Sequence, residues 1–288
     1  MGILLAVLSS IFLALANIFL KKSYKDFSPS ISFFIFSLFA LILWGSFGLV
    51  LGVQFSNFLF GFFVGLVSAI LGQAIYFYVL SKGELSITAT ILSSYSIYTI
   101  LFSTLFNKER LLETTLVLVI LAILGTLIVS SPEKGKFNKE DLKKLSFILW
   151  AIFAAVGIGA ADTLTKYYIT KTSVGSFLFY VSIAQFIISF IYLRLEKESL
   201  GQFKSILSKL KEYKYALLGS LTVSISVVFL FLAFSFTLAS IVSPINASYP
   251  VLTVLLALIF LKEKITPKNA IGLALVIISI IGVGFVSS

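Results

Sequence analysis

Long apolar segments separated by short polar loops occupy almost the whole of this 288-residue chain. A helix needs about 20 apolar residues to cross the hydrocarbon core of a bilayer, and in lipid its backbone polar groups must be satisfied internally. Ten segments meet this length, at 2–20, 30–52, 58–80, 86–106, 112–130, 146–165, 174–194, 215–234, 239–261 and 269–286. The sequence therefore predicts an all-α membrane protein with ten transmembrane helices.

The composition excludes several classes of protein. Hydrophobic residues make up 59% of the chain and charged residues 12%, whereas soluble domains carry roughly 45–50% apolar and about 25% charged residues. The chain has neither Cys nor His, so we expect no disulfide, no zinc site and no cofactor. The net charge of +10 comes from basic residues in short loops. There they set topology and contact lipid headgroups, so we expect membrane lipids and no nucleic acid as partners.

The chain contains an internal repeat. In residues 95–110 a tyrosine is followed by an apolar run and a Lys-Glu-Arg turn, and residues 249–264 repeat this order with a Lys-Glu-Lys turn 154 positions later. Each half then holds five segments, and an odd number forces the two copies into opposite orientations, as in many transporters. We expect a first repeat at 1–131, a connecting loop at 132–145 and a second repeat at 146–288, inverted around a central cavity.

The basic residues divide unequally between the two faces that this topology predicts. On the face that carries both termini the loops hold four, and the remaining eighteen lie on the other face; the four are Lys108, Arg110, Lys166 and Lys171. Because cytoplasmic loops are enriched in Lys and Arg, we expect both termini outside the cell and the protein in the plasma membrane.

The second half carries the residues of a known family. The stretch 249–251, the turn 261–266, and then Gly272 and Gly282 resemble the EamA-type branch of the drug/metabolite transporter superfamily. Asn17, followed by two lysines at the end of the first segment, is also similar to that family. The first half departs from it, because Ser96 stands where the second copy has Pro250. The resemblance implies two inverted repeats around a central cavity and the export or exchange of small organic solutes.

The function that we expect is secondary active transport of an amino acid, another metabolite or a drug-like compound. We expect export by alternating access, with protons as the candidate coupling ion. The protein is expected to be a monomer or a weak homodimer. A sugar-phosphate or nucleotide-type exchanger of the same fold is the alternative, and an intramembrane enzyme is a less favoured one. The chain lacks a GxxxxGK[ST] sequence, which argues against an ATP-driven pump.

Polar residues inside apolar segments are the candidates for solute binding, because a polar side chain in lipid is costly unless it faces the bundle interior or water. They could instead form an interfacial aromatic belt or bond one helix to another. The candidates are Asn17, Gln73, Tyr76, Tyr95, Tyr98, Thr99, Asn246 and Tyr249.

Two further groups of residues could serve the transport cycle. Asp162 is the acidic residue placed within a segment, and it could couple transport to protons or form an i,i+4 ion pair with Lys166. Pro244 and Pro250 could act as hinges, because proline interrupts a helix. The glutamates of the two repeated turns are expected to fix hairpin geometry.

Overall fold

The computed structural model describes residues 1–55, 57–82, 85–130, 145–198, 210–252 and 267–286. Throughout these ranges the regular elements are helices. They are α1 (Gly2–Ser23), α2 (Pro29–Leu51), α3 (Phe58–Val67), η1 (Ser68–Ala74), α4 (Ile75–Lys82), α5 (Leu85–Ser93), α6 (Tyr95–Phe106), α7 (Glu113–Ser130), α8 (Leu145–Lys171), α9 (Val174–Leu195), α10 (Leu210–Phe236), α11 (Ala239–Asn246) and α13 (Pro267–Val286).

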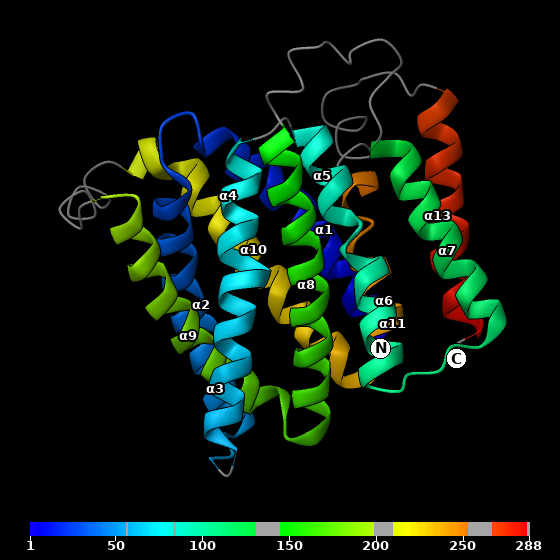
Figure 1. The fold of residues 1–288 in the computed structure, drawn as a ribbon, viewed down its shortest axis with the longest axis horizontal. Helices are drawn as coiled ribbons and strands as arrows, with labels where there is room; N and C mark the ends of the chain where they lie inside the picture. The colour runs from blue at the N-terminus through cyan, green and yellow to red at the C-terminus, as the bar shows by residue number, and fades with distance from the viewer. Residues whose placement is uncertain (56, 83–84, 131–144, 199–209, 253–266, 287–288) are drawn as a thin grey trace.

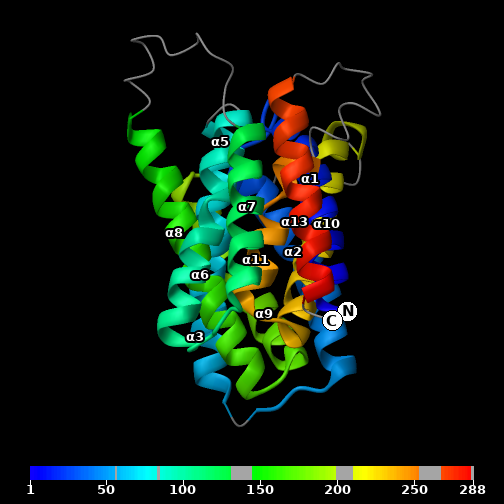
Figure 2. The ribbon, with the colours of Figure 1, turned by 90° about the vertical axis from the view of Figure 1, so that its right-hand side faces the viewer.

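The helices form an up-and-down bundle, and α1 begins at the same end of the bundle at which α13 finishes (Figure 1). Corresponding helices of the two halves lie side by side, α2 with α9, α7 with α13 and α6 with α11. The turned view shows α7 and α13 as neighbours on one side of the bundle (Figure 2). The most extensive helix–helix contacts therefore join the two halves.

Equivalent pairs of helices pack together when the two halves are exchanged. Helix α1 packs against α10, and its counterpart α8 packs against the run formed by α3, η1 and α4. Helices α1 and α8 run in opposite directions along the bundle (Figure 1). This is the arrangement that an inverted repeat predicts. The proposed boundaries remain a prediction, because most of the loop at 132–145 lies outside the described residues.

Six described helical runs are long and apolar enough to cross a membrane: Gly2–Ser23, Pro29–Leu51, Phe58–Lys82, Ile148–Lys171, Val174–Leu195 and Lys211–Phe236. Three shorter apolar helices lie at Ile91–Phe106, Glu113–Ile128 and Ala270–Val283. Large apolar side chains such as Ile42, Val50 and Leu59 are exposed on the described surface, as lipid contact requires. The molecule is thus a multi-pass helical membrane protein. The count of ten spans stays a prediction, since much of the segment 239–261 is outside the described ranges.

The segment 86–106, which we predicted as one helix, is interrupted at Ser94, between α5 and α6. The Ser94 hydroxyl donates to the carbonyl of Ile91 at 2.6 Å. In the second half the helix is interrupted at Ala247 and Ser248, and the Ser248 hydroxyl donates to the carbonyl of Ile245 at 2.6 Å. Such local serine bonds compete with the helical pattern, and these two are 154 positions apart, as the sequence repeat is.

A second irregularity lies in the middle of the third predicted segment. Between α3 and α4 the helix widens into the π-helical turn η1. π-helical turns are rare and frequently occur at functional sites. Here the turn contains Ser68, Gly72 and Gln73, which all border the cavity described next.

Candidate solute-binding cavity

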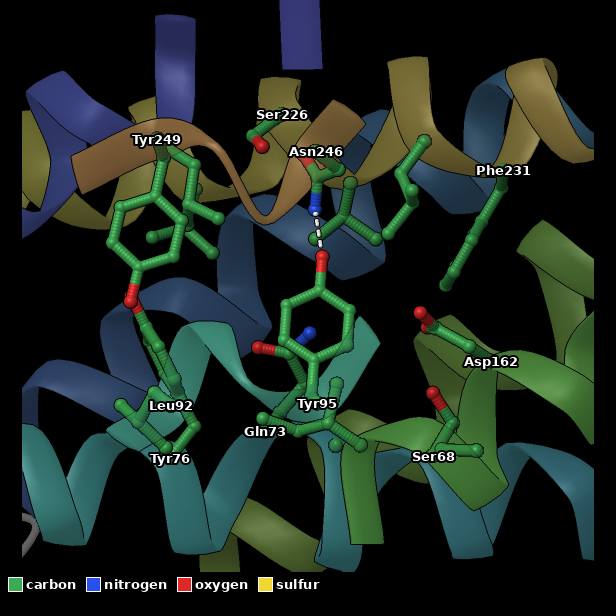
Figure 3. Close-up of a pocket in the computed structure, with 17 residues that line it drawn as sticks. Ser68, Gln73, Tyr76, Leu92, Tyr95, Asp162, Ser226, Phe231, Asn246 and Tyr249 are labelled. Atoms are coloured by element: carbon green, nitrogen blue, oxygen red, sulfur yellow. Dashed lines mark hydrogen bonds between the residues drawn. The ribbon is translucent and has the colours of Figure 1, made fainter. Parts of the chain in front are cut away.

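A cavity lies between the two halves, where the interrupted helices and η1 meet (Figure 3). It is bordered by the first-half elements α1, η1, α4, α5 and α6, and by α8, α10 and α11 of the second half. Its labelled residues are Ser68, Gln73, Tyr76, Leu92, Tyr95, Asp162, Ser226, Phe231, Asn246 and Tyr249. The cavity therefore has both polar and apolar walls, and both repeats contribute to them.

Tyr95 and Asn246 meet across the cavity from the two halves. The Asn246 side-chain amide donates to the Tyr95 hydroxyl at 2.8 Å (Figure 3), and this hydroxyl donates to the carbonyl of Ser243 at 3.3 Å. The other end of the Asn246 amide accepts a bond from Ser9 at 2.7 Å. The amide orientation follows from this pattern of partners. These contacts fix the position of α11 against α1 and α6.

Asp162 lies on α8 and points into the cavity on the side away from Tyr249 (Figure 3). Its side chain is 6% exposed, and one carboxylate oxygen accepts a bond from the Ser243 hydroxyl at 2.7 Å. The ion pair with Lys166 that we considered is absent from the described structure. The Lys166 ammonium group instead donates to the backbone carbonyls of Phe234 at 2.6 Å and Thr237 at 3.0 Å. Asp162 and Lys166 are one helical turn apart on α8, and their side chains contact different partners.

The remaining wall is built from Tyr76, Gln73 and Tyr249. The Tyr76 hydroxyl donates to the side-chain oxygen of Asn17, so Asn17 positions a cavity residue without bordering the cavity itself. Tyr249 follows the second helix break, as Tyr95 follows the first. Its hydroxyl donates to the carbonyl of Ala89 at 3.4 Å.

The structure thus brings six of the sequence candidates to one cavity: Gln73, Tyr76, Tyr95, Asp162, Asn246 and Tyr249. The other candidates lie outside its lining. Thr99 is buried and donates to the carbonyl of Tyr95 at 3.2 Å, and Tyr98 is only partly buried on the same helix. Pro244 borders a separate small space beside Ser96, and Pro250 is buried just after the second break.

Several cavity residues were not among the candidates. Ser68, Ser226 and Phe231 border the cavity, and Ser243 supplies the hydroxyl that contacts Asp162. Serine and phenylalanine are frequent throughout the chain, so single residues of these types give no signal in the sequence. Ser226 and Phe231 lie on α10, a helix that the sequence showed to be apolar but from which no candidate was chosen.

Glu109 closes the end of the bundle at which the chain termini lie. One of its carboxylate oxygens accepts the backbone N–H of Ala239 at 3.0 Å, and the other accepts the Ser240 N–H at 3.0 Å and its hydroxyl at 2.5 Å. Glu109 is 7% exposed. A carboxylate at a helix N-terminus satisfies unpaired N–H groups and complements the helix dipole. Glu109 therefore caps α11 of the opposite repeat.

Two lysines at equivalent positions of the repeat cap the C-terminal ends of helices, as Glu109 caps an N-terminal end. Lys166, on α8, bonds the carbonyl of Phe234 in α10, and Lys21, on α1, bonds the carbonyl of Leu80 in α4 at 3.1 Å. Leu80 and Phe234 are 154 residues apart, which is the repeat offset. A cation at the C-terminal end of a helix is favourable because the last carbonyls lack partners.

Comparison with known proteins agrees with this architecture. The EamA-like transporter family matches residues 1–131 and 145–285 of the chain. One solved crystal structure superimposes with a TM-score of 0.76 at 15% identity, over 99% of this chain and 96% of its own. At that identity the likeness shows the fold alone.

Relatives with shorter matches were also found. An S-adenosylmethionine uptake transporter of Rickettsia conorii is 28% identical over 103 residues, which are 35% of this chain and 33% of that protein. The corresponding transporter of Rickettsia bellii matches to the same extent. An uncharacterized protein of Methanocaldococcus jannaschii is 38% identical over 76 residues, 26% of this chain and 56% of that protein. The alignment spans only about a third of the length of the two rickettsial transporters.

The family match covers nearly the whole chain, and the helical bundle with its apolar surface agrees with it. The chain belongs to the EamA-like transporter family and is a multi-pass helical membrane protein.

Proposed function

We propose that the protein is a secondary active transporter that carries a small organic solute through the central cavity by alternating access. The observation that carries this proposal is the cavity between the two halves, bordered by a helix break from each. Interrupted helices at the interface of inverted repeats are typical of solute sites in secondary transporters. The two five-helix repeats at 1–131 and 146–288 would rock against each other around it.

The size of the cavity supports a closed conformation. The cavity has a volume of about 60 Å³, which leaves room for only a few water molecules. Pockets that hold drug-sized ligands measure about 300–1,000 Å³. A solute therefore enters only when the halves separate, and at the end near the termini this movement must break the contacts of Glu109 with α11.

The direction and the class of solute are part of the proposal. We propose export across the plasma membrane, with both termini outside the cell. The names of the rickettsial relatives, which are called uptake transporters, favour import instead. The alternative of a sugar-phosphate or nucleotide exchanger is less well supported. Such anions need Arg or Lys in the site, and no basic residue borders the cavity in the part of the chain that the structure describes.

Counterflow in proteoliposomes tests the proposal. Vesicles loaded with unlabelled solute are expected to accumulate the labelled solute, first S-adenosylmethionine and then amino acids and amphiphilic amines. Gly72→Leu should abolish accumulation, because an added Cβ at Gly72 meets only ordinary contacts at 3.6 Å and the larger side chain extends into the cavity. Ser235→Leu, at an exposed position, is the matched control and should transport normally.

Two results would contradict the proposal. Normal counterflow by Gly72→Leu would show that solute does not pass through this cavity. Flux that is the same with and without solute on the opposite side would indicate a channel. Driving the flux with a pH gradient, and sorting vesicles by protein orientation, then decides proton coupling and direction.

A further inference from the structure

We infer that the transported solute carries a positive charge and that the carboxylate of Asp162 is its counter-ion in the cavity. This inference rests on the proposed function and names the class of solute for the same site. It also gives Asp162 a direct contact with solute, beyond the structural or proton-coupling roles considered from the sequence.

The charge of the cavity favours a cationic solute. Among the described residues that border it, Asp162 is the acidic one, and none is Lys or Arg. The nearest lysine in sequence, Lys166, is engaged with the carbonyls of Phe234 and Thr237. A carboxylate removed from water is unfavourable unless a cation or hydrogen-bond donors compensate it. Ser243 supplies a donor, but the described lining holds no cation, so a cationic solute would compensate the charge of the ionised carboxylate.

Aromatic side chains border the same cavity as the carboxylate. In Figure 3 the ring of Phe231 lies on the Asp162 side of the cavity, and Tyr95 borders the same cavity. Aromatic faces attract organic cations such as ammonium and sulfonium groups. An acid and aromatic rings around one space therefore favour a diffuse positive charge over a neutral group.

The described lining suits an organic cation better than a metal ion. Hard divalent ions take six to eight oxygen ligands, mostly carboxylates and carbonyls. The described residues contain no group of three or more acidic, His or Cys side chains that could hold a metal. The apolar side chains of Leu92, Val227 and Leu230 form a further part of the lining, and they fit the carbon skeleton of an amphiphilic solute.

Matched ligand pairs test the inference directly. S-adenosylmethionine and S-adenosylhomocysteine differ in one methyl group and in the sulfonium charge, and S-methylmethionine and methionine form an equivalent pair. Binding to the purified full-length protein is measured by calorimetry and by ligand-induced thermal stabilisation. We expect the charged member of at least one pair to bind tenfold or more tightly than its neutral partner, since leaving a buried charge unpaired is costly.

Variants assign the effect to the carboxylate. Asp162→Asn should remove the discrimination within a pair, and Asp162→Glu should restore part of it. Glu113→Gln is the matched control, because it removes an acid from an exposed position and should leave discrimination unchanged. If Asp162→Asn does not fold, Ser243→Ala keeps the carboxylate and should still prefer the charged ligand.

The outcomes are distinct from those that test transport. Equal binding of charged and neutral members, binding of anionic solutes by the wild-type protein, failure of every charged member to bind, or unchanged discrimination in Asp162→Asn would each overturn the inference. Counterflow of a neutral or anionic solute would overturn it too, while the transporter proposal would stand. A charged solute that binds through Asp162 but never crosses the bilayer would instead overturn the transporter proposal.

Discussion

Tyr95 joins the two halves through a single hydroxyl group. The hydroxyl accepts from Asn246 and donates to the carbonyl of Ser243, so both of its bonds reach α11. Asp162 contacts the same helix through the Ser243 side chain. A solute that binds at either residue therefore acts on α11, which links solute binding to the position of that helix.

Replacing Tyr95 with Phe removes this hydroxyl and leaves the Asn246 amide without its acceptor. Hydrogen bonds between membrane helices are worth about 0.6 kcal/mol on average and at most about 1.7 kcal/mol, so we expect a stability loss of about 1 kcal/mol. Solute affinity should fall as well, because the cavity loses the Tyr95 hydroxyl group while the aromatic ring remains. Thermal unfolding and ligand titration measure the two effects.

Tyr98→Phe is the matched control, since Tyr98 lies on the same helix outside the cavity lining. If Tyr98→Phe lowers affinity as much as Tyr95→Phe, the assignment of Tyr95 to the solute site is wrong.

At the scale of elements, α11 is held at both ends and in the middle. Glu109 caps its first turn, Asp162 contacts Ser243, and Asn246 at its end bonds Ser9 and Tyr95. All eight residues of α11 are buried. A short helix with these contacts moves as a unit, and the break at Ala247 and Ser248 separates it from the helix that follows.

Glu109→Gln keeps the size of the side chain but removes the charge at the α11 N-terminus. Loss of an N-terminal cap costs about 0.5–2 kcal/mol, and we expect a loss within that range in detergent unfolding. The end of the cavity near the termini should also open more readily, which labelling of a cysteine introduced at Ser226 would detect. Glu113→Gln, at an exposed site, should do neither; equal effects in both variants would contradict the capping function of Glu109.

Helices α6 and α8 approach each other closely at Gly159. A Cβ there would lie 2.7 Å from the Cβ of Tyr98 and 2.9 Å from the backbone nitrogen of Thr99. Gly159→Ala should therefore force the helices apart and cost about 1–3 kcal/mol. Gly72→Ala, where the added Cβ meets atoms no closer than 3.6 Å, is the matched control and should leave the melting temperature nearly unchanged. A stable Gly159→Ala protein would contradict this tight packing.

At the scale of the whole molecule, the proposed orientation places the termini outside the cell. Arg110 follows α6 at the end of the bundle where α1 begins, and Lys25 follows α1 at the opposite end (Figure 1). Both side chains are exposed, and the chain contains no Cys. A single cysteine can therefore be introduced at each position and labelled without background.

With a membrane-impermeant maleimide on intact cells, Arg110→Cys should react and Lys25→Cys should react only after permeabilisation. The expectation follows from the positive-inside rule and the eighteen basic residues on the Lys25 face. The reverse labelling pattern would place the termini in the cytoplasm and contradict the proposed orientation.

Apolar length and the internal repeat allowed much of the fold to be predicted from the sequence. A helix must be long and apolar to exist in lipid, so hydropathy located α1, α2, α9 and the cores of α8 and α10. Hydropathy does not register local backbone competition, however. The π-helical turn η1 and the breaks at Ser94 and Ser248 were therefore missed, and proline was given a hinge role although the first break occurs without one.

The sequence by itself determined a helical membrane protein, an internal repeat and a short list of polar residues within apolar segments, because each of these is a property of composition or of spacing along the chain. Only the tertiary structure decided which of those residues share a cavity. It placed Tyr95, Asp162 and Asn246 together, turned Lys166 toward the carbonyls of α10, and directed Glu109 to the opposite repeat. The physical reason is that these side chains find their partners on other helices, 68 to 151 residues away in the chain, so the pairing leaves no local trace in the sequence.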